Sequence, residues 1–160
     1  MGKGKEVRAT VKGKLRFDSL EDKAFLLYAM RNFKDAVEYA HSLMRKGIEE
    51  SKIVKLLTSR ILNNKWYALS ALRRARLYSN QPYLKLKKPQ LFSVGSEDEN
   101  GNRNIKFDAT DTVRIKVPSA SGRHRWITAK ARFSRKHIPI RAGKLQRLLR
   151  GKNLFEGRQA

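Results

Sequence analysis

The sequence contains no cysteine among its 160 residues. Disulfides, zinc ribbons, other thiolate metal sites and a cysteine nucleophile are therefore excluded. Long hydrophobic runs are also missing: none approaches the roughly 20 apolar residues of a membrane span, and no apolar segment follows the first lysines as it would in a signal peptide. We therefore expect a cytoplasmic protein without a membrane partner.

Residues for catalysis are few. His41, His124 and His137 are far apart and lack metal-ligand spacing, so solvated or locally hydrogen-bonded histidines are expected. Glu97, Asp98 and Glu99 lie in a predicted exposed turn, and although Asp108 and Asp111 could in principle form a metal-binding pair, turn capping explains them more simply. The sequence shows no phosphate-binding loop, dinucleotide fingerprint or Ser-His-Asp arrangement. It predicts no enzyme activity, no catalytic residue, no metal, no cofactor and no small-molecule substrate.

What the chain does have is positive charge. Its 37 Lys and Arg outnumber 14 Asp and Glu, which gives a net charge of +23. A polyanion is the expected counterpart, because neutralising phosphates releases their condensed counterions. Since 40% of the residues are hydrophobic, the chain should fold rather than remain a disordered basic tail.

Hydrophobic periodicity predicts three helices between strands. Apolar residues alternate with basic ones over 6–17, which is typical of a strand or hairpin with one buried and one basic face. Three- and four-residue spacing then predicts a helix that begins after an N-cap at Asp18 or Ser19 and ends at Gly47. Two further helices, separated at Asn63-Asn64, should follow. The third helix should run from about Lys65 to Tyr78, with an apolar stripe at Trp66, Leu69 and Leu72.

The second half of the chain favours short strands. These are expected at 91–94, 104–107, 112–117 and 126–133, with a hairpin turn at 97–102 around Asn100-Gly101. A last short helix would carry Leu145, Leu148 and Leu149, and residues 1–5 and 156–160 would be disordered. The predicted fold class is α+β: a small β-barrel-like wedge formed by 1–18 and 81–140, a three-helix insert at 19–80, and a short C-terminal helix and tail at 141–160.

Clusters of cations on these elements are the candidate binding residues. On the C-terminal strands, cations alternate with apolar residues, and a merely solvated face would mix charges of both signs. Arginines at the end of the third helix exceed what the helix dipole requires, although dipole capping is the alternative. Trp126 has the parity of the basic face and is a candidate for stacking on a base. The predicted nucleic-acid-binding residues are Arg73, Arg74, Arg76, Lys87, Lys88, Arg114, Lys116, Arg125, Trp126, Lys130, Arg132, Arg135 and Lys136.

The ordered features resemble the N-terminal half of the TnpB (OrfB) family of transposon-encoded RNA-guided nucleases. The resemblance covers about Val7 to Ile140. It rests on the basic strand 7–17, the helix with Phe33-Lys34-Asp35-Ala36-Val37-Glu38-Tyr39, Lys46-Gly47-Ile48, the Ala-rich helix 66–78, Lys87-Lys88-Pro89 and the strands at 91–133.

This resemblance implies a wedge β-barrel interrupted by a helical recognition insert. In that family the two parts together bind a guide RNA and the duplex that it forms with its target. The RuvC-like nuclease domain of that family, with its Asp-Glu-Asp metal site and zinc ribbon, would follow the wedge and is absent from this sequence. We therefore expect a truncated or split TnpB-like protein, with a separate nuclease polypeptide as a potential partner.

The expected function is binding of structured RNA or an RNA–DNA duplex through phosphates and shape, with DNA as a further candidate ligand. The alternative is a structural protein, ribosome-associated or nucleoid, that binds DNA and RNA without a defined target. Competition between structured RNA, duplex DNA and single strands separates the two.

Overall fold

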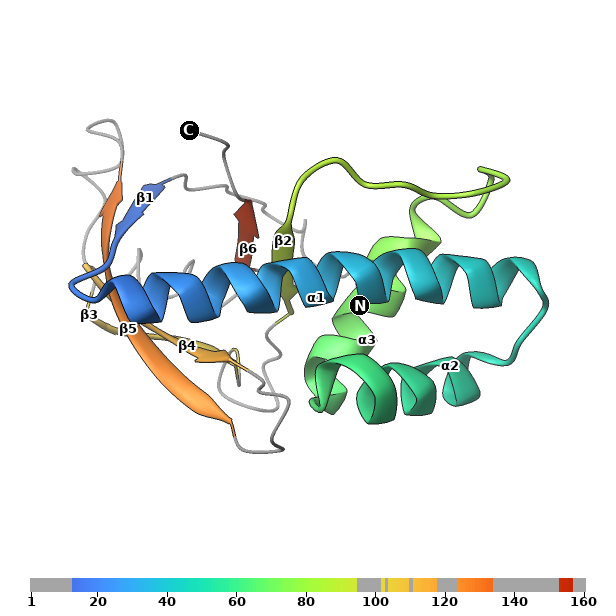
Figure 1. Cartoon of the computed structure of the whole chain (residues 1–160), viewed down its shortest axis with the longest axis horizontal. Helices are drawn as coiled ribbons and strands as arrows, with labels where there is room; N and C mark the ends of the chain where they lie inside the picture. The colour runs from blue at the N-terminus through green and yellow to red at the C-terminus, as the bar shows by residue number, and fades with distance from the viewer. Residues whose placement is uncertain are drawn as a thin grey trace, which may run out of the picture.

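The computed structural model of the chain describes residues 13–94, 102, 104–109, 111–117, 124–133 and 153–156. One long helix, α1, runs through most of the molecule, with a four-stranded sheet near its start and two shorter helices, α2 and α3, along its other half (Figure 1). The α+β class is confirmed, and three helices occupy the predicted insert.

Helix α1 spans Leu20–Arg45 and has the predicted ends. At its start, the Ser19 hydroxyl accepts a hydrogen bond from the backbone N–H of Asp22 at 3.4 Å. At its end, Gly47 adopts φ +77°, and the N–H of Ile48 reaches back to the carbonyl of Leu43 at 3.1 Å. This glycine-dependent turn satisfies carbonyls that the last helical turn would leave without a donor.

Helices α2 and α3 are separated at the predicted asparagine pair. Helix α2 (Glu50–Leu57) continues into a π-helical segment, η1 (Thr58–Leu62), which ends where Asn63 takes the left-handed conformation at φ 48°. Helix α3 (Lys65–Arg76) then begins at Asn64, whose side-chain oxygen accepts the N–H of Tyr67 at 3.0 Å.

The predicted apolar stripe of α3 is wrong at two of its three positions. Trp66 and Leu69 are only partly buried, whereas Tyr67 is completely buried. Alanines at 68, 71 and 75 share the buried face with Tyr67. Their small side chains let α3 lie close against α1, so the buried face combines these alanines with Tyr67 and Leu72, and Trp66 and Leu69 lie at its margin.

The four-stranded sheet is antiparallel and has the order β1-β5-β4-β3. Its strands are β1 (Gly13–Arg16), β3 (Ile105–Ala109), β4 (Thr112–Val117) and β5 (Arg125–Phe133). Strand β1 pairs with β5 although the whole helical insert lies between them in sequence. The register shifts between Phe107 and Ala109, which marks a β-bulge at the β3 edge.

Two expectations for the strands are corrected. Strand β2 (Gln90–Ser93) does not form a hairpin with β3; it pairs with β6 (Asn153–Glu156), a strand that the sequence analysis did not predict. The four-stranded sheet is also not closed into a barrel. Among the described strands, its edges are β1 and β3, which do not pair with each other, and β2 lies in a separate two-stranded sheet with β6. The helix expected around Leu145 lies outside the described residues.

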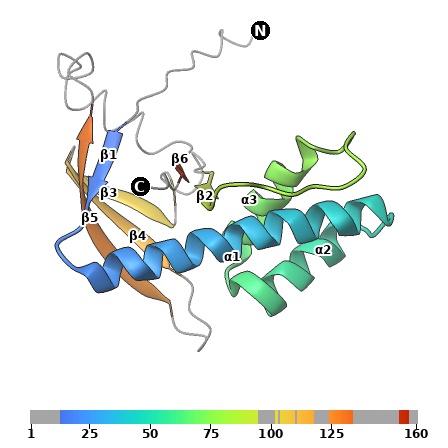
Figure 2. The same ribbon diagram turned by 45° about the horizontal axis from the view of Figure 1, so that its top comes forward.

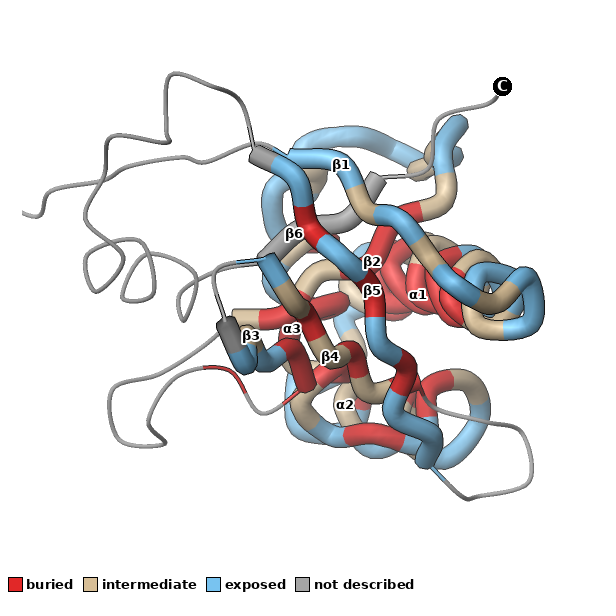
Figure 3. The backbone as a smooth tube through the Cα atoms, turned by 90° about the vertical axis from the view of Figure 1, so that its left-hand side faces the viewer, coloured by how far each residue is buried: buried red, intermediate tan, exposed pale blue. Residues whose placement is uncertain are grey.

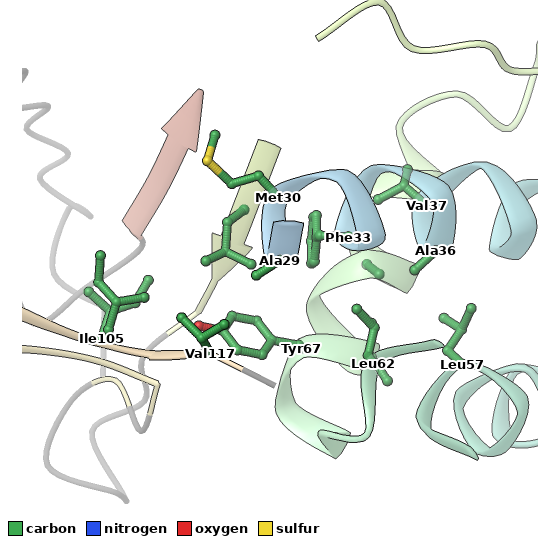
Figure 4. Packing of buried hydrophobic residues seen from close by; sticks show 14 of the residues in the cluster. Ala29, Met30, Phe33, Ala36, Val37, Leu57, Leu62, Tyr67, Ile105 and Val117 are labelled. Atoms are coloured by element: carbon green, nitrogen blue, oxygen red, sulfur yellow. The ribbon is translucent and has the colours of Figure 1, made fainter. Parts of the chain in front are cut away.

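Helices and sheet share one hydrophobic core. Phe33 of α1 meets the Tyr67 ring edge-on, with centroids 6.4 Å apart (Figure 4). The strands contribute alternate residues, such as Ile115 on β4 and Ile127 on β5, both essentially inaccessible to solvent. Figure 3 shows this alternation along β4 and β5. The inner face of the sheet is therefore covered, whereas the residues described on its outer face are exposed or only partly buried.

Candidate nucleic-acid interface

The outer face of the four-stranded sheet gathers cations from all four strands. Residues directly opposite each other in an antiparallel pair point to the same face. The register pairs Lys14 with Arg132, Lys106 with Arg114, and Lys116 with Trp126. Seven cationic residues therefore share this surface, which we call the basic sheet face: Lys14, Arg16, Lys106, Arg114, Lys116, Lys130 and Arg132.

Trp126 lies among the cations of this face. Its side chain is 39% exposed. The charged groups of Lys106, Arg114 and Lys116 lie 5.6, 5.5 and 5.9 Å from the centre of its ring. Cation–π attraction holds these flexible side chains near one another, although their charges repel. The face thus combines an aromatic surface with concentrated positive charge.

Acidic groups neutralise little of this charge. Asp108 forms an ion pair with Arg114 at 2.8 Å. The Lys130 ammonium donates to the Thr112 hydroxyl at 3.1 Å, and this hydroxyl in turn donates to the Asp111 carboxylate, so Asp111 lies near Lys130 without contacting it directly. Such a surface can bind phosphates through Lys and Arg and stack a base on Trp126.

The sequence matches the family described as SSO2105 N-terminal domain over residues 8–155. The chain belongs to this family. No curated protein and no solved structure shows significant similarity to it.

Arg125 does not join the basic sheet face. Its guanidinium contacts Glu21 at 3.4 Å and Asp22 at 3.2 Å at the start of α1, and it lies 4.5 Å from the centre of the Phe25 ring. Its parity, shared with Ile127, is that of the covered face. Arg125 therefore connects the start of β5 to α1. Its place in the period-two alternation, rather than the local density of charge, is the sequence signal that distinguishes it from the neighbouring cations of the sheet face.

The three arginines of α3 have different environments. Arg76 forms a double hydrogen bond with the Glu50 carboxylate of α2, with one N···O distance of 2.9 Å. Arg74 donates to the Gln90 side chain at 3.0 Å and lies 5.5 Å from the centre of the Phe92 ring on β2. Both hold α3 to its neighbours. Arg73 is exposed.

The Arg76 contact also changes the acidity of its partner. The hydrogen bond from Arg76, reinforced by its charge, lowers the pKa of the Glu50 carboxyl from the usual 4.5. Desolvation acts in the opposite direction and is the weaker influence.

The remaining predicted cations lie elsewhere. Lys87 and Lys88 are exposed on the segment between α3 and β2, neither of which belongs to the four-stranded sheet. Figure 2 shows this segment running along α1 before it reaches β2. Arg135 and Lys136 lie outside the described residues. The structure thus brings together Arg114, Lys116, Trp126, Lys130 and Arg132, and it separates them from the α3 and loop cations.

Three residues of the basic sheet face were missing from the predicted set. Lys14 and Arg16 lie on the strand whose alternation was recognised, but they were not assigned to the binding surface. Lys106 stands between Ile105 and Phe107, so the same period of two could have found it. Their contribution depends on which strands pair, and the pairing is not visible in local sequence.

The histidines and acids serve local contacts. Nε2 of buried His41 donates to the carbonyl of Tyr78 at 2.8 Å, and Nε2 of His124 donates to the carbonyl of Asn63 at 2.8 Å. This confirms locally hydrogen-bonded roles for both, while His137 lies outside the described residues. Asp111 accepts a hydrogen bond from the Thr112 hydroxyl at 3.1 Å.

Searches for two other kinds of site were negative within the described ranges. They contain no group of three or more His, Cys, Asp or Glu side chains placed to hold a metal ion. None of the helices in them is long and apolar enough to cross a membrane.

Proposed function

We propose that the chain is a nucleic-acid-binding module that holds structured RNA or an RNA–DNA duplex on the basic sheet face. The observation that carries the proposal is that seven cations share one sheet face, three of them beside Trp126, whereas Asp108 and Asp111 are the acids beside this face in the described part. A flat basic surface suits recognition of phosphates and backbone shape, because the major groove of an A-form helix is too narrow for side chains to read.

A relationship to the N-terminal half of TnpB is part of the proposal. Supporting it is the pairing of β1 with β5, which places the three helices as an insert between strands of one sheet. The open sheet departs from the barrel of that family. On this view the module acts without catalysis, in the cytoplasm or bound to the nucleoid or a ribonucleoprotein, and a nuclease domain on another polypeptide would be its partner.

The test compares two double variants with the same change in net charge. Lys106→Glu with Lys130→Glu reverses two exposed cations of the basic sheet face, whereas Lys52→Glu with Lys55→Glu reverses two exposed cations of α2. Fluorescence anisotropy with a labelled RNA hairpin should show about tenfold or more weakening for the first pair and about threefold or less for the second. Equal weakening would mean that overall charge, not this face, binds the RNA.

Competition between ligands then separates defined recognition from general charge neutralisation. Structured RNA or an RNA–DNA duplex should displace the hairpin at lower concentration than duplex DNA or single strands do. No preference among these competitors would favour the structural, non-specific protein instead. Wild-type affinity that stays constant between low and physiological salt would contradict binding through phosphates altogether.

A further inference from the structure

A hollow with positively charged lining lies beside α1, apart from the basic sheet face. Its volume is about 810 Å³. It is lined by Lys34, Gln81, Pro82, Tyr83, Lys85, Leu86 and Lys87. Three of these residues are lysines and none is acidic. We call this site the loop hollow, because most of its lining comes from the segment between α3 and β2.

Exposed and partly buried side chains alternate along residues 83–87 of this segment. Leu84 and Leu86 pack against the hydrophobic core. The residues that alternate with them, Tyr83, Lys85 and Lys87, are exposed. The core contacts of Leu84 and Leu86 anchor the segment, while the Tyr83 ring and the ammonium groups of Lys85 and Lys87 remain exposed along the hollow.

Glu38 of α1 fixes the segment rather than neutralising its lysines. The carboxylate of Glu38 accepts the backbone N–H of Leu86 at 2.9 Å and lies 3.8 Å from the Lys34 ammonium. Glu38 is not among the residues that line the loop hollow. Lys85 and Lys87 have no acidic partner in the part of the chain that the structure describes, so their charges are available to an anion.

Tyr83 indicates which anion fits. Its side chain is 76% exposed, more than that of Trp126 on the basic sheet face. An exposed aromatic ring beside lysines is typical of sites for single-stranded nucleic acid, where the ring stacks on a base and the cations follow the phosphates. Bases inside a duplex are stacked on one another, so such a ring, like Trp126, requires an unpaired base of a single strand or of a loop.

We propose that the loop hollow binds an unpaired nucleotide of a single strand, with its base on Tyr83 and its neighbouring phosphates at Lys85 and Lys87. The inference rests on the proposed function, since it gives a second surface to the same class of ligand. Figures 1 and 2 show the loop segment along the half of α1 away from the four-stranded sheet. The two surfaces would therefore hold different parts of one nucleic acid, a duplex and an unpaired extension.

The experiment measures binding of a short single-stranded RNA and of an abasic oligonucleotide of the same length to the full chain. Tyr83→Ala should weaken binding of the RNA about 5- to 100-fold, in line with the loss of one stacked base. It should leave binding of the abasic strand within about twofold, because phosphate contacts remain. Tyr83→Trp should retain RNA affinity, and Tyr28→Ala, at a half-exposed tyrosine of α1 outside the hollow, should have no effect.

Several results would overturn the inference. These are wild-type RNA affinity in Tyr83→Ala, equal loss in Tyr28→Ala, equal binding of RNA and abasic strand by the wild type, or displacement of the RNA by an equal concentration of polyglutamate. Binding of a blunt RNA duplex tests the basic sheet face independently of the loop hollow, so it distinguishes failure of this inference from failure of the proposed function. Duplex binding unaffected by Lys106→Glu with Lys130→Glu would refute the role of the basic sheet face and leave the Tyr83 result standing.

Discussion

The hydroxyl of Tyr67 on α3 donates a hydrogen bond to the backbone carbonyl of Lys116 on β4, at an O···O distance of 2.7 Å. Lys116 carries one of the cations beside Trp126, and its own N–H donates to the carbonyl of Asn104 at 2.7 Å. Asn104 in turn accepts from the side chain of Asn64, the N-cap of α3, at 3.0 Å. The helical insert thus fixes the strand that presents the centre of the basic sheet face.

Loss of the Tyr67 hydroxyl should destabilise the protein. Tyr67→Phe keeps the buried ring and removes the donor to the Lys116 carbonyl, so we expect the free energy of unfolding to fall by about 1–2 kcal/mol. Urea denaturation measures the change. Tyr83→Phe is the matched control, because it removes an exposed hydroxyl and should stay within about 0.5 kcal/mol of the wild type. An equal change in the two variants would contradict the role of the Tyr67 hydrogen bond.

The same residue should make stability fall at high pH. Burial raises the pKa of the Tyr67 hydroxyl above its usual 10.0, so the unfolded chain releases this proton at a lower pH than the folded protein does. Above pH 10 the unfolded state gains stability by about 1.4 kcal/mol per pH unit from this group.

The advantage of wild type over Tyr67→Phe should therefore narrow between pH 9 and pH 11, as measured by urea denaturation. Using the difference between the two proteins removes the contributions of the other tyrosines and the lysines. A constant difference across this range would show that the Tyr67 hydroxyl is not shielded from solvent.

Two arginines of β5 should differ in their effect on RNA binding. Arg132 points outward on the basic sheet face, whereas Arg125 is paired with acids of α1. If Arg132 contacts a phosphate, Arg132→Gln should lower the slope of log affinity against log salt for a duplex by about 0.9. Arg125→Gln should leave the slope unchanged. The reverse order of effects would place the ligand at the α1 side of the sheet.

The ion pair between Arg76 and Glu50 should contribute to the stability of the fold rather than to RNA binding. Both side chains are about half exposed, so Arg76→Gln should cost only about 0.5 kcal/mol at neutral pH, and Arg73→Gln still less. Since the folded-state pKa of Glu50 is lowered, this contribution is present above pH 4.5 and is lost as the pH falls through the folded-state pKa.

Thermal unfolding at pH 7 and at pH 3 tests this dependence. The difference in melting temperature between wild type and Arg76→Gln should shrink at the lower pH. A loss of RNA affinity in Arg76→Gln as large as that in Arg132→Gln would instead assign Arg76 to the binding surface.

Much of the secondary structure was predictable because its signals are local. Ser19 and Gly47 mark the ends of α1, and the asparagine pair 63–64 separates η1 from α3. Period-two alternation likewise placed Arg114, Lys116 and Trp126 on one side of their strands. Each of these signals depends on backbone geometry within a few residues, so the sequence alone carries it.

The local density of charge predicted less well than period-two alternation which cations lie on the outer face of the sheet. Arg125 and Arg132 lie seven positions apart in the same basic stretch, yet one pairs with α1 and the other faces outward. Trp66 and Tyr67 present a similar case, because both are large aromatic residues at the start of α3 and only the second is fully buried. Which face a helix buries depends on its neighbours.

By itself, the sequence determined a basic, cysteine-free α+β chain with three helices and an alternating strand pattern. The tertiary structure decided which strands pair: β1 with β5 across the helical insert, and β2 with β6 near the opposite end of the chain. Those pairings join segments far apart in sequence, and their choice depends on burying one common core rather than on any local preference. They convert scattered lysines and arginines into the basic sheet face, with the insert holding Lys116 in place through Tyr67.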